Sequence, residues 1–310
     1  MATVIVHKPG LLTTVQDRGR YGYQRYGMPV SGAMDVFSLE LANLLVGNDP
    51  GDTCLEATVS GPELEFTGAI WIAITGADMD PHLNDQDIPM NTAIDVMSGD
   101  RLGFRGLISG CRAYIAFSGG IAVPPVMGSR STYLRAGIGG FQGRALMPGD
   151  ELPLGELKGK PRLKRIPEGL IPEYKHEQTI RVISGPEAHC FEIAGLRSFL
   201  STEYTVTARS DRMGYRLSGE PILHKEGMTN IISAGISVGT VQVPGDGQPI
   251  ILMADRQTSG GYARIANVIT ADLTLLAQMR PRDKISFKET TLEISQQFCI
   301  SRQRVLLGLR

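Results

Sequence analysis

Short apolar runs separated by turn residues dominate this chain. The runs are rich in Val, Ile, Leu and Phe, and Gly, Pro, Asn and Asp stand between them. Such runs are typical of β-strands joined by tight turns. The predicted strands are Thr3–Val6, Leu64–Phe66, Ile70–Ile74, Arg101–Phe104, Ala113–Phe117, Thr179–Ile183, Ile231–Ile232, Thr240–Val243, Ile250–Met253 and Lys284–Phe287.

Helical periodicity is rarer. It is clearest over residues 34–46, where Phe37, Leu41 and Leu44 share one face and Gly47-Asn48 supplies a stop signal. Weaker patterns predict helices over residues 187–199 and 272–278. Because strands do not alternate with long helices, a doubly wound parallel fold is disfavoured. The pattern favours a mainly-β, barrel-like architecture with a few helices as lids.

One segment lacks both kinds of pattern. Residues 155–178 are rich in Lys, Arg, Glu and Pro, as expected of a connection between domains. We therefore predict an N-terminal lobe over residues 1–155, a connector over 156–178 and a C-terminal lobe over 179–310.

Composition narrows the classes of function. The formal net charge is −1 and charged residues make up 20% of the chain, which does not favour binding to nucleic acid or to anionic membranes. The N-terminus lacks the layout of a signal peptide, and the longest apolar run, residues 69–74, is too short to cross a bilayer. The four cysteines form no Cys-x-x-Cys pair. We expect a cytoplasmic protein with reduced thiols.

Several short segments resemble known functional motifs, but the residues around them do not fit those motifs. Residues 235–239 have the Gly-x-Ser-x-Gly spacing, but a strand pattern follows where a nucleophile elbow needs a helix. Residues 137–143 approach a dinucleotide-binding fingerprint with the last glycine one residue late, so a turn is favoured. Residues 78–87 carry several acids and His82, yet a hairpin turn at Asn84-Asp85 is favoured over a metal loop. We therefore predict no metal site.

Two polar clusters remain as candidate chemistry. The first has an amide, acids and a guanidinium suited to a small carboxylate-bearing substrate: Gln16, Asp17, Arg20 and Asp35. The second offers the same groups around the strand at residues 250–254: Arg212, Tyr215, Asp255, Arg256, Gln257 and Tyr262. The alternative is that each Asp–Arg pair only ties strand ends together. We expect the two clusters, one from each lobe, to face one pocket.

At these residues the chain resembles a known family, the biotin-dependent carboxyltransferase A/B family, also called allophanate hydrolase subunit 2-like. The resemblance spans nearly the whole chain. Its motifs are residues 14–22, 31–35, 44–48, 55–56, 74–77, 112–129, 135–140, 210–217 and 248–262.

The resemblance implies a fold of two cyclophilin-like β-barrel lobes and work in a multi-subunit complex. The implied activity is ATP-dependent cleavage of 5-oxo-L-proline to L-glutamate together with 5-oxoprolinase subunits A and B. The implied cofactor is ATP, and because the chain has no P-loop, we expect its site to be shared with partner subunits. Arg20 or Arg212 would then bind the substrate carboxylate, and Asp17, Asp35 or Asp255 would handle protons.

Two other functions stay open at this point. One is the carboxyltransferase component of a biotin-dependent urea carboxylase or allophanate system. Such systems carry biotin on the lysine of a Met-Lys-Met sequence, which this chain lacks. The other is a regulatory protein that binds and antagonises a kinase inhibitor.

Overall fold

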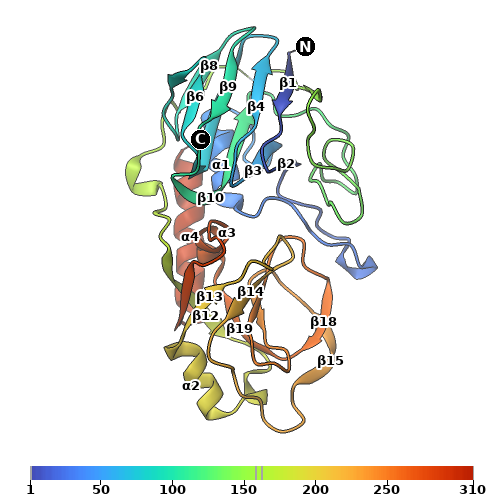
Figure 1. The fold of residues 1–310 in the computed structure, drawn as a ribbon, viewed down its shortest axis with the longest axis vertical. Coiled ribbons are helices and arrows are strands. Elements are labelled where there is room, and N and C mark those ends of the chain that lie inside the picture. The colour runs from blue at the N-terminus through green and yellow to red at the C-terminus, as the bar shows by residue number, and fades with distance from the viewer. Residues whose placement is uncertain (1, 158, 162, 310) are drawn as a thin grey trace. The chain divides into compact units, whose positions relative to one another are not determined.

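The computed structural model describes residues 2–157, 159–161 and 163–309. The described chain forms two compact units (Figure 1). Unit 1 consists of Met1–Tyr21, Ser31–Tyr174 and Val305–Arg310, and unit 2 consists of Gly22–Val30 and Lys175–Arg304.

Unit 1 is built on two sheets. The larger sheet has six strands, in the order β11 (Glu151–Pro153), β1 (Thr3–Lys8), β4 (Glu63–Phe66), β9 (Arg101–Phe104), β6 (Pro81–Leu83) and β7 (Gln86–Asp87). The smaller sheet has five, in the order β2 (Leu12–Gln16), β3 (Cys54–Thr58), β10 (Ser109–Phe117), β5 (Ile70–Asp78) and β8 (Ala93–Val96). All the strand pairs of these two sheets are antiparallel.

The two sheets of unit 1 enclose its main core. Val4, Val6 and Phe66 from the larger sheet join Ile72 and Ile115 from the smaller sheet in one buried cluster. The opposite face of the smaller sheet is covered as well, because α1 (Val36–Leu45) packs there against a second cluster. Consequently β10 has both faces buried and is a nearly continuous apolar run.

The second core of unit 1 also draws on distant parts of the chain. Ile166, which lies in the segment expected to connect the lobes, is fully buried there. Leu306, near the end of α4 (Leu292–Gly308), and Leu309, just after it, pack against the same cluster. The 3₁₀ turn η2 (Glu168–Leu170) contributes Leu170.

Unit 2 is a closed barrel. Its strands follow one another in the order β12 (Glu177–Ser184), β19 (Arg264–Val268), β16 (Thr240–Gln242), β17 (Ile250–Leu252), β14 (Gly214–Ser218), β13 (Glu203–Val206) and β20 (Lys284–Glu289). Parallel pairing of β20 with β12 closes the ring, whereas the other neighbours are antiparallel. Closure leaves no unpaired edge in this sheet.

Smaller elements surround the barrel. In α2 (Ile193–Ser201), the Phe199 ring stacks on Phe287 of β20 with centroids 4.4 Å apart. A separate two-stranded sheet pairs β15 (Asn230–Gly235) with β18 (Ser259–Tyr262), and Figure 1 shows these strands running alongside each other. The remaining elements are η1 (Gln24–Tyr26), η3 (Ala188–Cys190), η4 (Thr270–Asp272) and α3 (Leu273–Ala277).

The structure confirms the mainly-β fold class and places a strand at every predicted strand. The barrel is closed in unit 2, whereas the strands of unit 1 form the two sheets just described. The helix predicted over 187–199 begins only at Ile193, because Phe191 is extended and forms a bridge with His224. The helix α4 was not predicted, since its apolar residues do not gather on one regular face.

The structure also confirms the turns that we favoured over a metal loop, a dinucleotide-binding loop and a nucleophile elbow. Asn84 and Asp85 both have positive φ between β6 and β7, as a two-residue hairpin turn requires. Residues 137–143 form turns, and residues 236–239 lead into β16 and not into a helix.

Two further observations concern the chain as a whole. No helix in the part that the structure describes combines the length and the apolar character needed to span a bilayer. All four cysteines are free thiols, and three of them are buried.

One ion pair joins neighbouring parts of the barrel wall. Arg264, at the start of β19, donates from Nε and Nη2 to the two carboxylate oxygens of Glu187, each at 2.5 Å. Its Nη1 donates to the carbonyl of Gly235 at 2.8 Å, which fixes the end of β15. Both charged side chains are mostly buried. Hydrogen bonds from Arg264 hold the pKa of Glu187 below its usual range.

Replacing this carboxylate should weaken unit 2 in a pH-dependent way. We expect Glu187→Gln to lower the free energy of unfolding at pH 7 by about 1–3 kcal/mol, because a charge-assisted fork is lost. Since the folded-state pKa is depressed, the wild-type advantage is full above about pH 4.3 and falls as pH drops through the folded pKa. Urea unfolding of wild type and Glu187→Gln at several pH values, from pH 7 down to below about pH 4.3, measures this difference in stability. Glu226→Gln, at an exposed acid, is the control. Equal stability of Glu187→Gln and wild type at pH 7 would contradict the prediction.

Candidate functional site

In unit 1, three of the predicted residues converge on one segment, residues 129–132. Asp17 accepts hydrogen bonds from Ser129 Oγ at 2.7 Å and from the Arg130 backbone N–H at 2.5 Å. Arg20, which is 1% exposed, donates from Nη2 to the Ser131 carbonyl at 2.5 Å. The carboxylate and the guanidinium therefore hold this segment against the end of β2.

Gln16 completes this convergence from inside the core. Its side chain is fully buried, and Nε2 donates to Thr14 Oγ1 at 2.9 Å and to the Thr132 carbonyl at 3.3 Å. Its Oε1 has no hydrogen-bond partner among the described residues. The next turn is packed just as tightly, because a Cβ at Gly139 would lie 2.1 Å from the Ser131 carbonyl oxygen. Only glycine fits there.

Asp35 lies in a neighbouring network that begins the helix α1. Its carboxylate accepts from the Ser38 backbone N–H at 3.1 Å and from Ser38 Oγ at 2.6 Å, which makes it the N-cap of α1. The Asp35 N–H donates to the Tyr114 hydroxyl at 2.8 Å, and that hydroxyl donates to Glu56 Oε2 at 2.7 Å. Burial and the nearby Glu56 carboxylate raise the pKa of Tyr114 well above its ordinary value.

This network holds an irregular loop. Glu56 also accepts from the Met34 N–H at 2.8 Å, and the Ala33 N–H donates to the Asp17 carbonyl at 2.9 Å. Ser31 and Gly32 both have positive φ, so the loop needs these fixed contacts. We did not predict Glu56 and Tyr114 as site residues. An acid within the apolar strand β3 was the signal available in the sequence.

In unit 2, Arg212 and Asp255 form a buried ion pair. Arg212 Nε donates to Asp255 Oδ2 at 2.9 Å and Nη2 donates to Oδ1 at 3.1 Å, and both side chains are less than a tenth exposed. The backbone repeats the contact, because the Asp255 N–H donates to the Arg212 carbonyl at 2.8 Å. The pair therefore ties the residues just before β14 to the turn after β17.

The other predicted residues of unit 2 lie in different surroundings. Tyr215 is in the barrel wall, where its hydroxyl donates to the Met279 carbonyl at 3.3 Å. Gln257 is partly buried after β17, and Tyr262 is 43% exposed at the end of β18. Arg256 is 8% exposed and donates to the Ile236 and Met253 carbonyls. Of the six residues predicted in this unit, Arg256 lines the cavity described next.

Arg256 is one of the residues that line a cavity of about 910 Å³ within unit 2. This volume suits a small organic ligand. Three short segments line the cavity: Gln24, Arg25 and Gly27; Gly235, Ile236, Ser237 and Val238; and Arg256, Thr258 and Ser259. The lining has two guanidinium groups, an amide and three hydroxyls, and none of these residues is acidic. An anionic ligand is therefore favoured over a cationic one.

We did not predict Arg25 and Ser237 from the sequence. Arg25 stands on the segment between Gly22 and Gly27, outside both predicted clusters, and Ser237 belongs to the Gly-x-Ser-x-Gly spacing that we set aside. The signal for Arg25 was a short polar stretch between two glycines. The sequence feature that could have indicated Ser237 was its position in a loop between two predicted strands, with no helix following.

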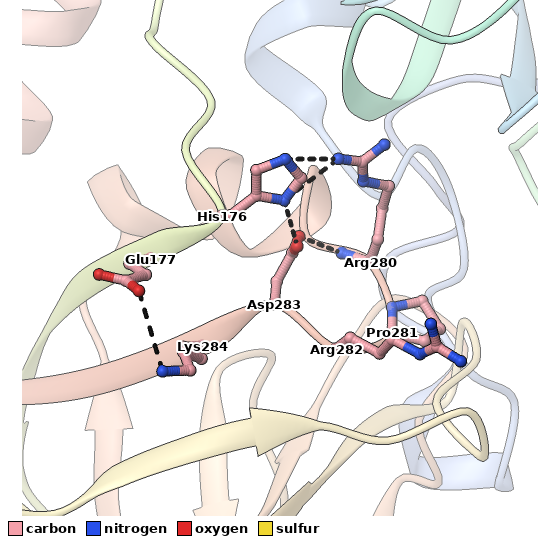
Figure 2. Close-up of a pocket in the computed structure, with 7 residues that line it drawn as sticks. All are labelled: His176, Glu177, Arg280, Pro281, Arg282, Asp283 and Lys284. Atoms are coloured by element: carbon pink, nitrogen blue, oxygen red, sulfur yellow. Dashed lines mark hydrogen bonds and ion pairs between the residues drawn. The ribbon is translucent and has the colours of Figure 1, made fainter.

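A second hollow, of about 470 Å³, lies at the start of β20 (Figure 2). His176 Nδ1 is 2.7 Å from Asp283 Oδ1, and Asp283 Oδ2 accepts from the Arg280 backbone N–H at 2.7 Å. Figure 2 shows the His176 ring between Asp283 and the Arg280 guanidinium. Glu177 and Lys284 line the hollow as well. Since its lining mixes acids with bases, this hollow is less suited to an anion than the cavity around Arg256.

The turn beside this hollow contains a backbone outlier. The Asp283 N–H donates to the Arg280 carbonyl at 3.0 Å, and between them Pro281 is followed by Arg282 with a φ of 80°. This arrangement fits a type II turn, whose third position favours glycine. An L-residue in that conformation costs about 1–2 kcal/mol.

Replacing Arg282 should therefore separate the effect of the backbone from that of the side chain. We expect Arg282→Gly to be more stable than Arg282→Ala by about 1 kcal/mol, because alanine keeps the strained Cβ and glycine does not. Urea unfolding of the two variants under identical conditions measures the difference. Equal stability would mean that the turn is not strained at this position.

Comparison with known proteins places the fold in a family. The family model for the carboxyltransferase domain, subdomains A and B, matches residues 26–289, and the chain belongs to this family. It is 42% identical to the C subunit of 5-oxoprolinase from Escherichia coli over 92% of this chain and 91% of that protein. It is 37% identical to the C subunit of 5-oxoprolinase from Haemophilus influenzae over 90% of this chain and 89% of that protein.

A solved structure has the same fold. The crystal structure of urea amidolyase from Kluyveromyces lactis superposes with a TM-score of 0.95 at 32% identity. The match covers 99% of this chain but only 20% of that much longer protein.

The Arg212–Asp255 pair gives a stability prediction. We expect Arg212→Ala or Asp255→Ala alone to lower the free energy of unfolding by about 3–5 kcal/mol, because each leaves a buried charge without its partner. The double variant Arg212→Ala with Asp255→Ala should lose less than the sum of the two. Urea unfolding of the three variants tests this.

An exposed ion pair supplies the control for that cycle. Lys284 lies 2.7 Å from Glu203, with both side chains almost half exposed, so Glu203→Ala should change stability little. Additive losses in the Arg212 and Asp255 variants would contradict a coupled pair.

Proposed function

We propose that this chain is the C subunit of a 5-oxoprolinase, which cleaves 5-oxo-L-proline to L-glutamate with hydrolysis of ATP. The observation that carries the proposal is the 42% identity to an Escherichia coli protein of that name over nine tenths of both chains. The match covers 91% of the length of that protein, whereas the match to Kluyveromyces lactis urea amidolyase covers only 20% of that chain.

The reaction itself explains the need for ATP. A five-membered lactam is a stabilised amide, so opening it near neutral pH needs coupling to a favourable reaction. In the proposed route, the terminal phosphoryl group of ATP moves to the lactam oxygen, which releases ADP. Water then attacks the ring carbon, the C–N bond breaks, and the ring nitrogen leaves as an amine to give an acyl phosphate. A second water hydrolyses this acyl phosphate to L-glutamate and phosphate.

The cavity of unit 2 supports this substrate class. 5-Oxo-L-proline carries a carboxylate, and the cavity offers two guanidinium groups with no acidic residue in its lining. We propose that the A and B subunits complete the complex and that the nucleotide is held with their help. Proton handling by Asp17, Asp35 or Asp255 stays a prediction.

A second candidate function has its own supporting observation. The superposition on urea amidolyase favours a carboxyltransferase acting with a biotin carrier on another chain. Urea is neutral, so two cationic side chains in the cavity have no evident partner on that substrate. Carboxybiotin, which carries a carboxylate, would be the anion in this case.

Reconstitution separates the candidates. We expect a complex of this chain with the A and B subunits of 5-oxoprolinase to hydrolyse ATP when 5-oxo-L-proline is added, to release L-glutamate, and to be insensitive to avidin. Complexes that lack this chain are the control and should not release L-glutamate. The measurements are phosphate release and L-glutamate formation, with 5-oxo-L-proline or urea as substrate.

The other outcomes are equally specific. Turnover of urea that avidin inhibits would replace the proposal with the carboxyltransferase function. Absence of turnover with both substrates, in a complex that assembles, would favour a regulatory binding protein.

A further inference from the structure

The cavity of unit 2 has a fixed cationic wall. Arg256 is nine-tenths buried, and its Nη1 donates to the Met253 carbonyl at 3.2 Å while Nε lies 3.4 Å from the Ile236 carbonyl. The preceding residue, Asp255, is held by Arg212 through side chain and backbone. The charge of Arg256 is therefore held in one place before a ligand arrives, which lowers the entropy cost of binding.

The second cationic residue of the cavity, Arg25, lies on an exposed 3₁₀ turn. Arg25 belongs to η1, in which no residue is buried, and glycines with φ of 91° and 80° flank it at positions 22 and 27. A Cβ at either glycine would meet nothing within 4 Å, so the backbone conformation, not the space, requires glycine there. Arg25 is therefore exposed on this segment, whereas Arg256 is held by buried contacts.

Arg25 itself is partly ordered by its neighbour. Its guanidinium carbon lies 4.7 Å from the centroid of the Tyr26 ring, within the range of a cation–π contact. This contact orients the side chain while its hydrogen-bond donors stay available, and no hydrogen bond of the guanidinium is found within the described residues. An arginine in this state can bind a carboxylate with two parallel hydrogen bonds.

We propose that Arg25 is the specificity-determining residue that binds the substrate carboxylate in this cavity, with Arg256 supplying the fixed second positive charge. The inference rests on the proposed function, since it takes 5-oxo-L-proline as the ligand. It differs from our sequence-based expectation, which gave this role to Arg20 or Arg212. Both of those side chains are buried and bonded to groups of the protein itself.

The hydroxyls of the lining suit the rest of such a ligand. Ser237, Thr258 and Ser259 can donate to or accept from the ring amide, whereas the carboxylate needs a cation. The polyphosphate of ATP is the other anion of the reaction. The test must therefore show which Michaelis constant depends on Arg25.

The experiment uses the whole complex with the A and B subunits and measures ATP hydrolysis with the concentration of each substrate varied in turn. Arg25→Gln should raise KM for 5-oxo-L-proline about 10- to 100-fold, which corresponds to the loss of one charge-assisted pair, while KM for ATP stays unchanged. Arg25→Lys should recover part of the loss, because it keeps the charge without the planar fork. Arg197→Gln, at an exposed arginine of α2 outside the cavity, is the matched control.

A neutral analogue isolates the carboxylate. With the carboxamide of 5-oxo-L-proline as substrate, wild type should have a far lower kcat/KM than with the acid. Arg25→Gln should bring the two values close to each other. A structural role of Arg25 would lower both values together and would leave their ratio unchanged.

The outcomes distinguish the inference from the proposed function. Wild-type turnover of 5-oxo-L-proline together with an unchanged KM in Arg25→Gln would overturn the inference and leave the function standing. A raised KM for ATP alone would move Arg25 to the nucleotide and would also overturn it. Absence of 5-oxo-L-proline turnover in the wild-type complex would overturn the function itself.

Discussion

The buried ion pair between Arg212 and Asp255 is the constraint on which the barrel's functional face depends. Burying two charges is unfavourable unless each is fully paired, and here a two-pronged contact and a backbone hydrogen bond supply the pairing. The pair fixes the turn after β17, and the next residue, Arg256, enters the cavity from that turn. The pair therefore positions the cavity's fixed charge without lining the cavity itself.

In unit 1, buried polar side chains also fix the backbone, but they do so through hydrogen bonds to backbone groups and not through an ion pair. Gln16, Asp17 and Arg20 direct their side chains at residues 129–132, whose backbone would otherwise be left without enough partners. Asp35 and Glu56 do the same for the start of α1. Polar residues concentrated in an apolar, glycine-rich chain thus serve first to satisfy buried backbone. Any chemistry they perform must be compatible with these bonds.

The dependence of buried polar residues on distant partners explains which strands could be predicted from the sequence and which could not. Strands such as β9 were predictable because apolar runs ended at turn residues, and the hairpin at Asn84-Asp85 was predictable because these residues tolerate positive φ. The strand β2 was missed because Thr13, Thr14 and Gln16 are polar residues that the fold buries. Burial of this kind depends on partners more than a hundred positions away, such as Thr132, which no local pattern records.

The site was harder to predict than the fold for a related reason. The sequence indicated where charged residues gather, and it left open the alternative that an Asp–Arg pair only ties strand ends together. It could not show that their donors and acceptors bond to each other, because that depends on the register of β14 and β17. Arg25, in contrast, was not predicted, because it lies on an exposed segment outside both clusters of charged residues. Only the folded chain brings it to the same cavity as Arg256.

The balance of charge in that cavity is the strongest physical guide to the ligand. Two arginines line one cavity that has no acid in its lining, and a cationic lining of this kind favours an anionic ligand. An anion gains electrostatic attraction from this lining, whereas a neutral ligand such as urea gains none. By this argument a lactam with a carboxylate is a better ligand for the cavity than urea.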